Sequence, residues 1–176
     1  MSATTGFIET ALTVNRRTVR IEADPVERLT SILRDRLGLK GTKVGCDAGD
    51  CGACSVLLDN EVVCACMVAA SQLDGRSVTT IEGLGEDRRG RRLQEAFLTH
   101  GGAQCGICTP GMLVSAKALL DRIPMPSRTV IEDALGGVLC RCTGYRKIVQ
   151  AVAAVAGTPA TRSATGSLPV RPESFR

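Results

Sequence analysis

Nine cysteines fall into two separate groups, and this distribution constrains the fold more than any other feature of the chain. Five lie between Cys46 and Cys66, and four lie between Cys105 and Cys142. The 176 residues suffice for one ordinary domain or two small ones, and small hydrophobic cores need additional links to be stable. We therefore expect each cysteine group to stabilise one part of the chain.

These cysteines are expected to bind metal rather than to pair as disulfides. The N-terminal MSATTGFIET lacks the basic stretch and apolar run of a secretory signal, and no segment has the about 18 uninterrupted apolar residues of a membrane span. We therefore expect a cytoplasmic chain without a membrane segment. Thiols in a reducing compartment more often bind metal or do redox chemistry, and an odd number of cysteines cannot pair completely.

The composition also argues against nucleic-acid binding. One Tyr, three Phe and no Trp leave few aromatic side chains on which bases could stack. The positive charge is concentrated locally in EDRRGRRLQ, residues 86–94, which we interpret as a solvated connector.

The first half of the sequence predicts an α+β domain that ends near Gly83. ALTVNRRTVRIEA alternates as two strands do, and Arg16 at the expected turn favours a connection wider than a tight hairpin. A helix is predicted next, with Asp24 as N-cap, Pro25 at the first helical position and Gly38 after its end. Three strand-like runs follow: SVLL, VVCACMV and SVTTIEGL.

From Leu93 the pattern changes to helical segments. Four have Thr, Ser or Pro starts or apolar stripes at helical spacing: RLQEAFLTH, TPGMLVSAKALLDR, SRTVIEDAL and TGYRKIVQAVAAVA. We expect residues 1–83 and 84–156 to form separate domains. Residues 157–176, which are rich in Ser, Thr, Pro and Gly, are expected to be an extended or disordered tail.

The first cysteine group has the spacing of a plant-type [2Fe-2S] loop. Cys46, Cys51 and Cys54 form C-x4-C-x2-C, and a distant fourth thiol comes from Cys64 or Cys66. Glycines in the loop let backbone amides approach the sulfides. Zinc also binds four thiolates, but structural zinc sites usually consist of two closely spaced pairs, so iron–sulfur is favoured. If VVCACMV is a strand, its two cysteines project to one face, and local geometry does not choose between them.

The spacing of the second cysteine group does not by itself identify one kind of site. Its members form two short pairs: Cys105 with Cys108, and Cys140 with Cys142. Alone, these pairs leave open a zinc site, a redox-active dithiol and an iron–sulfur cluster. Both pairs precede expected helix starts, at TPG and TGY, where the helix dipole favours anionic thiolates. This placement favours a buried, anionic metal centre between two helix ends.

Taken together, three segments resemble the small iron–sulfur subunit of molybdenum hydroxylases. This is the xanthine oxidase family, which includes carbon monoxide dehydrogenase, hydroxybenzoyl-CoA reductase, aldehyde oxidoreductases and N-heteroaromatic hydroxylases. The segments are GCDAGDCGACSVLLD with the later CAC, then AQCGICTPGM, then LCRCTGYRKIVQAV, over nearly all of residues 8–156. The resemblance implies a β-grasp, ferredoxin-like N-terminal domain with one [2Fe-2S] cluster and a C-terminal four-helix domain with another.

The resemblance also implies the cluster ligands. They are Cys46, Cys51, Cys54 and Cys66 for the first cluster, and Cys105, Cys108, Cys140 and Cys142 for the second. The family's fourth ligand in the first site precedes an apolar residue and an Ala-rich segment, as in CMVAA, which selects Cys66 and leaves Cys64 as a small buried filler. Gln104 matches a family residue that contacts the molybdopterin cofactor, and Cys142 lies at the same contact. Val138 stands where the family usually has Asn.

The implied function is electron transfer, with no catalytic residue on this chain. In the family, the helical domain's cluster faces a large molybdopterin-binding (molybdenum) subunit, and the ferredoxin-like cluster faces a medium FAD-binding subunit. We therefore expect a heterotrimer, or a dimer of heterotrimers, in which single electrons pass through both clusters. The alternatives are a free-standing ferredoxin-like carrier and a zinc-stabilised interaction module.

Overall fold

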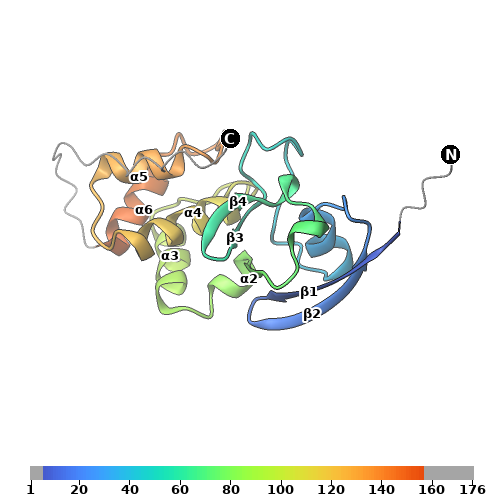
Figure 1. Ribbon diagram of the computed structural model, residues 1–176. Coiled ribbons are helices and arrows are strands. Elements are labelled where there is room, and N and C mark those ends of the chain that lie inside the picture. The colour runs from blue at the N-terminus through green and yellow to red at the C-terminus, as the bar shows by residue number, and fades with distance from the viewer. Residues whose placement is uncertain (1–5, 157–176) are drawn as a thin grey trace.

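The computed structural model describes residues 6–156, which combine a five-stranded sheet with several helices. Figure 1 shows the sheet toward one end of the molecule and helices α3, α5 and α6 at the other. The predicted α+β class is confirmed. The predicted tail, residues 157–176, lies outside the described residues. Within the described part of the chain, no helix is long and apolar enough to cross a membrane.

The sheet has the strand order β2-β1-β5-β3-β4. Its strands are β1 (Ile8–Val14), β2 (Arg17–Ala23), β3 (Ser55–Leu58), β4 (Glu61–Cys64) and β5 (Ser77–Thr79). β1 pairs in parallel with β5, while the pairs β1–β2, β3–β4 and β3–β5 are antiparallel. The hairpin β1–β2 and the hairpin β3–β4 are therefore joined through β5.

The turn between β1 and β2 is tighter than the sequence predicted. Val14 pairs directly with Arg17, so only two residues form the turn, and Asn15 and Arg16 have φ values of 48° and 66°. Both values lie in the left-handed region that a two-residue turn of the favoured type requires. Arg16 does not force a wider turn, because Asn15 is held in this conformation by hydrogen bonds to Thr80.

The helix predicted from Pro25 begins four residues later. Its first turn is α1 (Leu29–Ser31), and it continues as a π-helical segment, η1 (Ile32–Arg36). The backbone from Glu27 to Leu29 forms hydrogen bonds with residues 68–70 instead of within a helix. The Glu27 carbonyl accepts the N–H of Ala70 at 2.8 Å, and the Leu29 N–H donates to the Val68 carbonyl at 2.8 Å. This pairing keeps the segment extended and prevents an earlier helix start.

Two 3₁₀ turns lie between β4 and β5, and one short helix follows β5. They are η2 (Ala65–Met67), η3 (Ala70–Gln72) and α2 (Ile81–Leu84). Because β4 ends at Cys64, the next cysteine lies in a 3₁₀ turn and not in a strand. The premise that the two cysteines of VVCACMV project from one strand face is therefore wrong.

Helices α3 to α6 follow the sheet. Their bounds are α3 (Arg88–Thr99), α4 (Thr109–Arg122), α5 (Arg128–Leu135) and α6 (Arg146–Ala156). The Asp87 carboxylate caps α3 by accepting the N–H groups of Arg89 and Gly90 at 2.7 and 3.0 Å. The basic stretch predicted to be a connector therefore forms the first turns of α3, because an Asp cap starts the helix before the apolar pattern begins.

Strand β3 joins the two hydrophobic cores. Val56 and Leu58 pack in the core of the sheet, while Leu57 belongs to the core formed by the helices. Successive strand residues point to opposite faces, and all four β3 residues are buried. Helix α4 lies against β3 on the Leu57 side, so both cysteine groups are held by one packed unit.

Candidate metal centres

The loop before β3 directs backbone N–H groups at the first thiols. The N–H groups of Ala48 and Cys51 both lie 3.3 Å from Cys46 Sγ, and the N–H of Cys46 lies 3.3 Å from Cys51 Sγ. The bonds from Cys51 and Ala48 lower the pKa of Cys46 to about 7. A Cβ at Gly45 would lie 2.7 Å from Cys51 Sγ, so this loop accommodates only glycine there.

The other two predicted ligands of the first site lie deeper. Cys54 and Cys66 are 3% and 2% exposed. Burial raises the pKa of both thiols, that of Cys66 to about 11, and the two side chains hydrogen-bond to each other. The first group therefore contains one outer pair, Cys46 with Cys51, and one buried pair.

Cys64 lies in the same group, at the end of β4. Its thiol is half-buried, lies 3.6 Å from the Gly49 carbonyl, and has its pKa raised by burial. The structure thus brings five thiols together, and Cys66 is the more buried of the two candidates for the fourth ligand.

An ion pair that the sequence did not reveal anchors the outer edge of this loop. Arg28 donates to the Asp47 carbonyl at 2.8 Å and also pairs with the Asp47 carboxylate. Asp47 has a φ of 55°, so the contact holds a residue in a conformation that L-residues seldom adopt. No local pattern in the sequence connects these two residues.

The second group is formed where two loops meet, one before α4 and one before α6. Its inner pair is Cys108, which is the N-cap of α4 and 7% exposed, and Cys140, which is half-buried. Burial and hydrogen bonding with Cys140 raise the pKa of Cys108 to about 12. Burial opposes ionisation of Cys140, but bonds from the Thr143 hydroxyl, 3.1 Å away, and from its N–H lower the Cys140 pKa overall.

The outer pair of the second group is exposed. A backbone bond from Ile107, followed by a side-chain bond with Cys142, lowers the pKa of Cys105, and the same thiol contact raises the pKa of Cys142. Gln104, next to Cys105, is also exposed. The two residues predicted to contact the molybdopterin cofactor, Gln104 and Cys142, are therefore both exposed, and the Cys105–Cys142 contact places them near each other. Helix α6 begins at Arg146, so the turn after Cys142 is longer than predicted.

The Tyr145 side chain forms hydrogen bonds within the second group. Its hydroxyl accepts the N–H of Cys140 at 2.9 Å and donates to the Val138 carbonyl at 3.3 Å. It therefore fixes the backbone on both sides of Leu139. The left-handed conformation of Tyr145, with a φ of 63°, turns the ring back toward Cys140, and a sequence pattern does not encode this reversal.

Both groups have the donors that a [2Fe-2S] cluster needs. Each contains two thiol pairs, and such a cluster is held by four thiolates, two on each iron. Within residues 6–156, no group of three or more His, Cys, Asp or Glu side chains is placed to hold a single metal ion, so the fit to a cluster rests on the number and chemistry of the thiols in each group. The described cysteines are all free of disulfides, so all the thiols in both groups are available as ligands.

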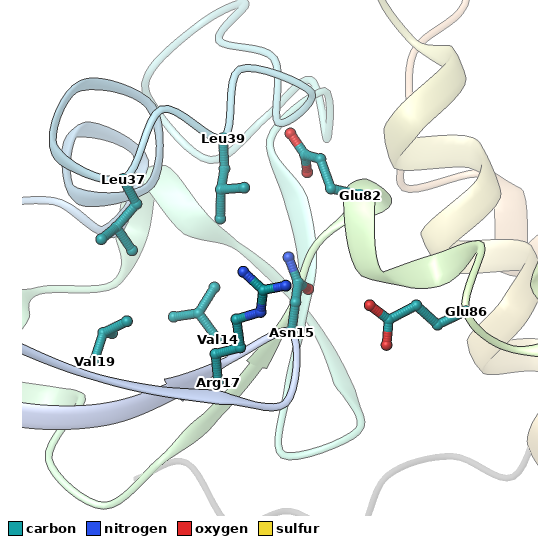
Figure 2. A pocket seen from close by; sticks show the side chains of 8 residues that line it. All are labelled: Val14, Asn15, Arg17, Val19, Leu37, Leu39, Glu82 and Glu86. Carbon is teal, nitrogen blue, oxygen red and sulfur yellow. The ribbon is translucent and has the colours of Figure 1, made fainter.

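A separate hollow of about 270 Å³ lies between the β1–β2 hairpin, the loop after η1 and α2 (Figure 2). The hollow is lined by the polar side chains of Asn15, Arg17, Glu82 and Glu86 and by apolar side chains, all labelled in Figure 2. The Glu82 carboxylate accepts the Gly41 N–H at 2.7 Å and the Thr80 hydroxyl at 2.5 Å. The Glu82 side chain therefore joins the loop after η1 to α2.

Comparisons with known proteins agree with this geometry. Residues 12–80 match the family described as "2Fe-2S iron-sulfur cluster binding domain", and residues 80–153 match the "[2Fe-2S] binding domain" family. The chain is 46% identical over 145 residues to the "Nicotine 6-hydroxylase small subunit" of Paenarthrobacter nicotinovorans, covering 82% of this chain and 87% of that protein. The chain belongs to the family of small [2Fe-2S] subunits of molybdenum hydroxylases.

Further members support this assignment. The "Nicotinate dehydrogenase small FeS subunit" of Eubacterium barkeri is 45% identical, over 80% of this chain and 90% of that protein. In the crystal structure of quinoline 2-oxidoreductase from Pseudomonas putida 86, one chain is similar with a TM-score of 0.81 and 38% identity, covering 86% of this chain and 94% of that one. The resemblance identified from the sequence is confirmed, and this iron–sulfur subunit is an electron-transfer component of an oxidoreductase.

Proposed function

We propose that this iron–sulfur subunit relays single electrons between a molybdopterin centre and FAD, both held by partner subunits. The observation that carries the proposal is the arrangement of two four-thiol sites in one packed unit, each with an exposed outer edge. Cys46 lies at one edge, and Cys105 and Cys142 lie at the other. Each edge can approach a different partner, while the buried thiols lie within the chain.

The proposed ligands follow the thiol pairs. They are Cys46, Cys51, Cys54 and Cys66 at the first site, and Cys105, Cys108, Cys140 and Cys142 at the second. A [2Fe-2S] cluster supplies one-electron redox chemistry when bound. The chain contributes thiolates and the N–H groups of Ala48 and Cys51, which stabilise negative charge on sulfur. In this assignment Cys64 is a small buried side chain beside the first site.

We further propose that the two sites belong to two domains. Residues up to 83 correspond to a β-grasp, ferredoxin-like domain, and residues 84–156 to a four-helix [2Fe-2S] domain. Support comes from the separate cores of the sheet and the helices and from the two family matches, which meet at residue 80.

The partner at the second site is proposed to be the large molybdopterin-binding subunit, contacted by Gln104 and Cys142. Both residues are exposed, and Ile107 and Leu139 nearby in the chain are 51% and 60% exposed. Such a mixture of apolar side chains around a polar contact suits a protein interface. The proposed complex also contains a medium FAD-binding subunit at the first site and is a cytoplasmic heterotrimer or a dimer of heterotrimers.

Purification of the native complex tests this function. We expect co-purification with two larger subunits at fixed stoichiometry, together with the iron and acid-labile sulfide of two [2Fe-2S] clusters per copy of this chain. A chain that purifies alone with both clusters would support the free-standing carrier instead. Stoichiometric zinc without labile sulfide would support the interaction module.

A further inference from the structure

One peptide group in the loop of the first site is hydrogen-bonded at both ends. It joins Asp47 to Ala48. Its carbonyl accepts a hydrogen bond from Nη1 of Arg28 at 2.8 Å, and its N–H donates to Cys46 Sγ at 3.3 Å. The guanidinium of Arg28 is therefore connected to a proposed cluster ligand through a single peptide group.

This connection strengthens the hydrogen bond to the Cys46 sulfur. A hydrogen bond from a cationic donor is about twice as strong as one between neutral groups, and hydrogen bonds in a chain polarise one another. The cation at the carbonyl end draws electron density away from the N–H end. The Ala48 N–H then stabilises negative charge on Cys46 better than an isolated peptide group would.

Arg28 is held in place by contacts outside the loop. Its backbone pairs with that of Ala69, and as the N-cap of α1 its carbonyl accepts the N–H groups of Ser31 and Ile32 at 3.0 and 3.2 Å. Its guanidinium also pairs with the Asp47 carboxylate. The backbone that carries the donor is thus fixed independently of the loop that carries the acceptor.

We propose that Arg28 is a positioning residue that raises the reduction potential of the first site by acting through the Asp47–Ala48 peptide group. This inference rests on the proposed function. One electron, supplied by the second site and later passed to FAD, adds negative charge at the first site, while no bond forms or breaks and no proton moves. Hydrogen bonds to the ligand sulfurs stabilise this charge and so favour the reduced form.

A direct effect of the Arg28 charge can be separated from this one. The side chains of Arg28 and Asp47 are 46% and 49% exposed, so solvent screens their charges. Their charges also offset each other at the first site, because the two side chains are paired. Removing both charges together therefore leaves the net charge unchanged but still removes the cationic donor from the peptide carbonyl.

The test compares Arg28→Met, Asp47→Gly and the double variant in the native complex. Arg28→Met retains an unbranched side chain but removes the donor. Asp47→Gly is the matched control: it keeps the Arg28 bond to the backbone carbonyl, and glycine adopts the φ of 55° found at this position without strain. The double variant removes the donor at constant net charge.

We expect Arg28→Met and the double variant to lower the potential of the first cluster in a potentiometric EPR titration. The reduction equilibrium should shift several-fold, where tenfold corresponds to about 59 mV for one electron. Hydrogen exchange at the Ala48 amide, followed by mass spectrometry, should become faster. The second cluster in the same sample should keep its potential, and Asp47→Gly should not lower that of the first.

If Arg28→Met does not retain the first cluster, the double variant carries the same expectation, because glycine removes the backbone strain at position 47. A wild-type potential in the double variant would overturn the inference, since only charge would then matter. Equal falls in Arg28→Met and Asp47→Gly would overturn it too, because the ion pair and not the carbonyl bond would be responsible.

Loss of the first cluster from the double variant as well would show that Arg28 is needed for assembly, and it would also overturn a role in setting the potential. Absence of both clusters from the wild-type complex would instead count against the proposed function itself.

Discussion

The side chain of Asn15, at the tip of the β1–β2 hairpin, forms two hydrogen bonds with Thr80, 65 residues later. Its Oδ1 accepts the Thr80 N–H, and its Nδ2 donates to the Thr80 hydroxyl, each at 2.9 Å. Thr80 is fully buried and lies between β5 and α2, where the two family matches meet. Figure 2 shows Asn15 at this junction. This pair therefore fixes the sheet relative to the helices that follow.

Replacing Asn15 with Ala should destabilise the chain by about 2 kcal/mol, because it leaves the buried Thr80 N–H without its acceptor and removes the amide that donates to the Thr80 hydroxyl. Asn60, in the β3–β4 turn, has a similar φ of 68° and is exposed, so Asn60→Ala controls for the cost of a left-handed Ala. The measurement is chemical denaturation followed by circular dichroism. Equal losses in the two variants would show that backbone strain, and not the Thr80 contact, determines the effect.

The sequence predicts features that depend on local spacing and misses those that depend on distant partners. The helix at Thr109–Arg122 could be predicted because its Pro start and apolar positions are local. The tight turn at Arg16 could not, since it depends on Thr80. The late start of α1 could not either, because residues 68–70 occupy the backbone that would otherwise form the first helical turn.

The same distinction applies to the candidate site. Cysteine spacing indicated both thiol groups, and the structure gathers them. The contact of Arg28 with Asp47 and that of the Tyr145 hydroxyl with Cys140 depend on residues with positive φ. A reversal of chain direction at such residues brings together side chains that no periodic pattern pairs.

Replacing Cys64 and Cys66 with Ser, one at a time, tests which of them is the fourth ligand of the first site. Cys66→Ser should lose the iron of the first cluster and spare the second, because Cys66 pairs with Cys54 in the buried part of the group. Cys64→Ser should retain both clusters. Iron analysis and EPR of the two variants provide the measurement, and the reverse behaviour would reassign the ligand to Cys64.

Tyr145→Phe should affect the second site alone. The change removes the acceptor of the Cys140 N–H and the donor to Val138, at a cost of about 1 kcal/mol. We expect a shifted reduction potential for the second cluster, since hydrogen bonding near the ligands tunes such potentials. Potentiometric EPR titration measures both clusters in one sample, so the first is the internal control. An equal shift in both would contradict a local role.

Removal of iron should reveal the pKa difference between thiols. The thiolate is the reactive form, so alkylation of Cys46, whose pKa is lowered to about 7, should accelerate as pH rises through 7 and level off above it. Cys108, whose pKa is raised to about 12, should remain nearly unreactive across that range. Mass spectrometry of iodoacetamide-treated, iron-free chain follows each site. A shared pH midpoint would show that the loop N–H groups do not stabilise the Cys46 thiolate.

EPR spectroscopy of the reduced complex during a potentiometric titration tests whether this chain holds a two-cluster relay. We expect two distinct [2Fe-2S] signals of equal intensity that appear at different potentials, because one site lies in a glycine-rich loop beside the sheet and the other between helices. Cys66→Ser should remove one signal, and Cys108→Ser should remove the other. A single signal, or a reduced complex with no iron–sulfur signal, would contradict a two-cluster relay.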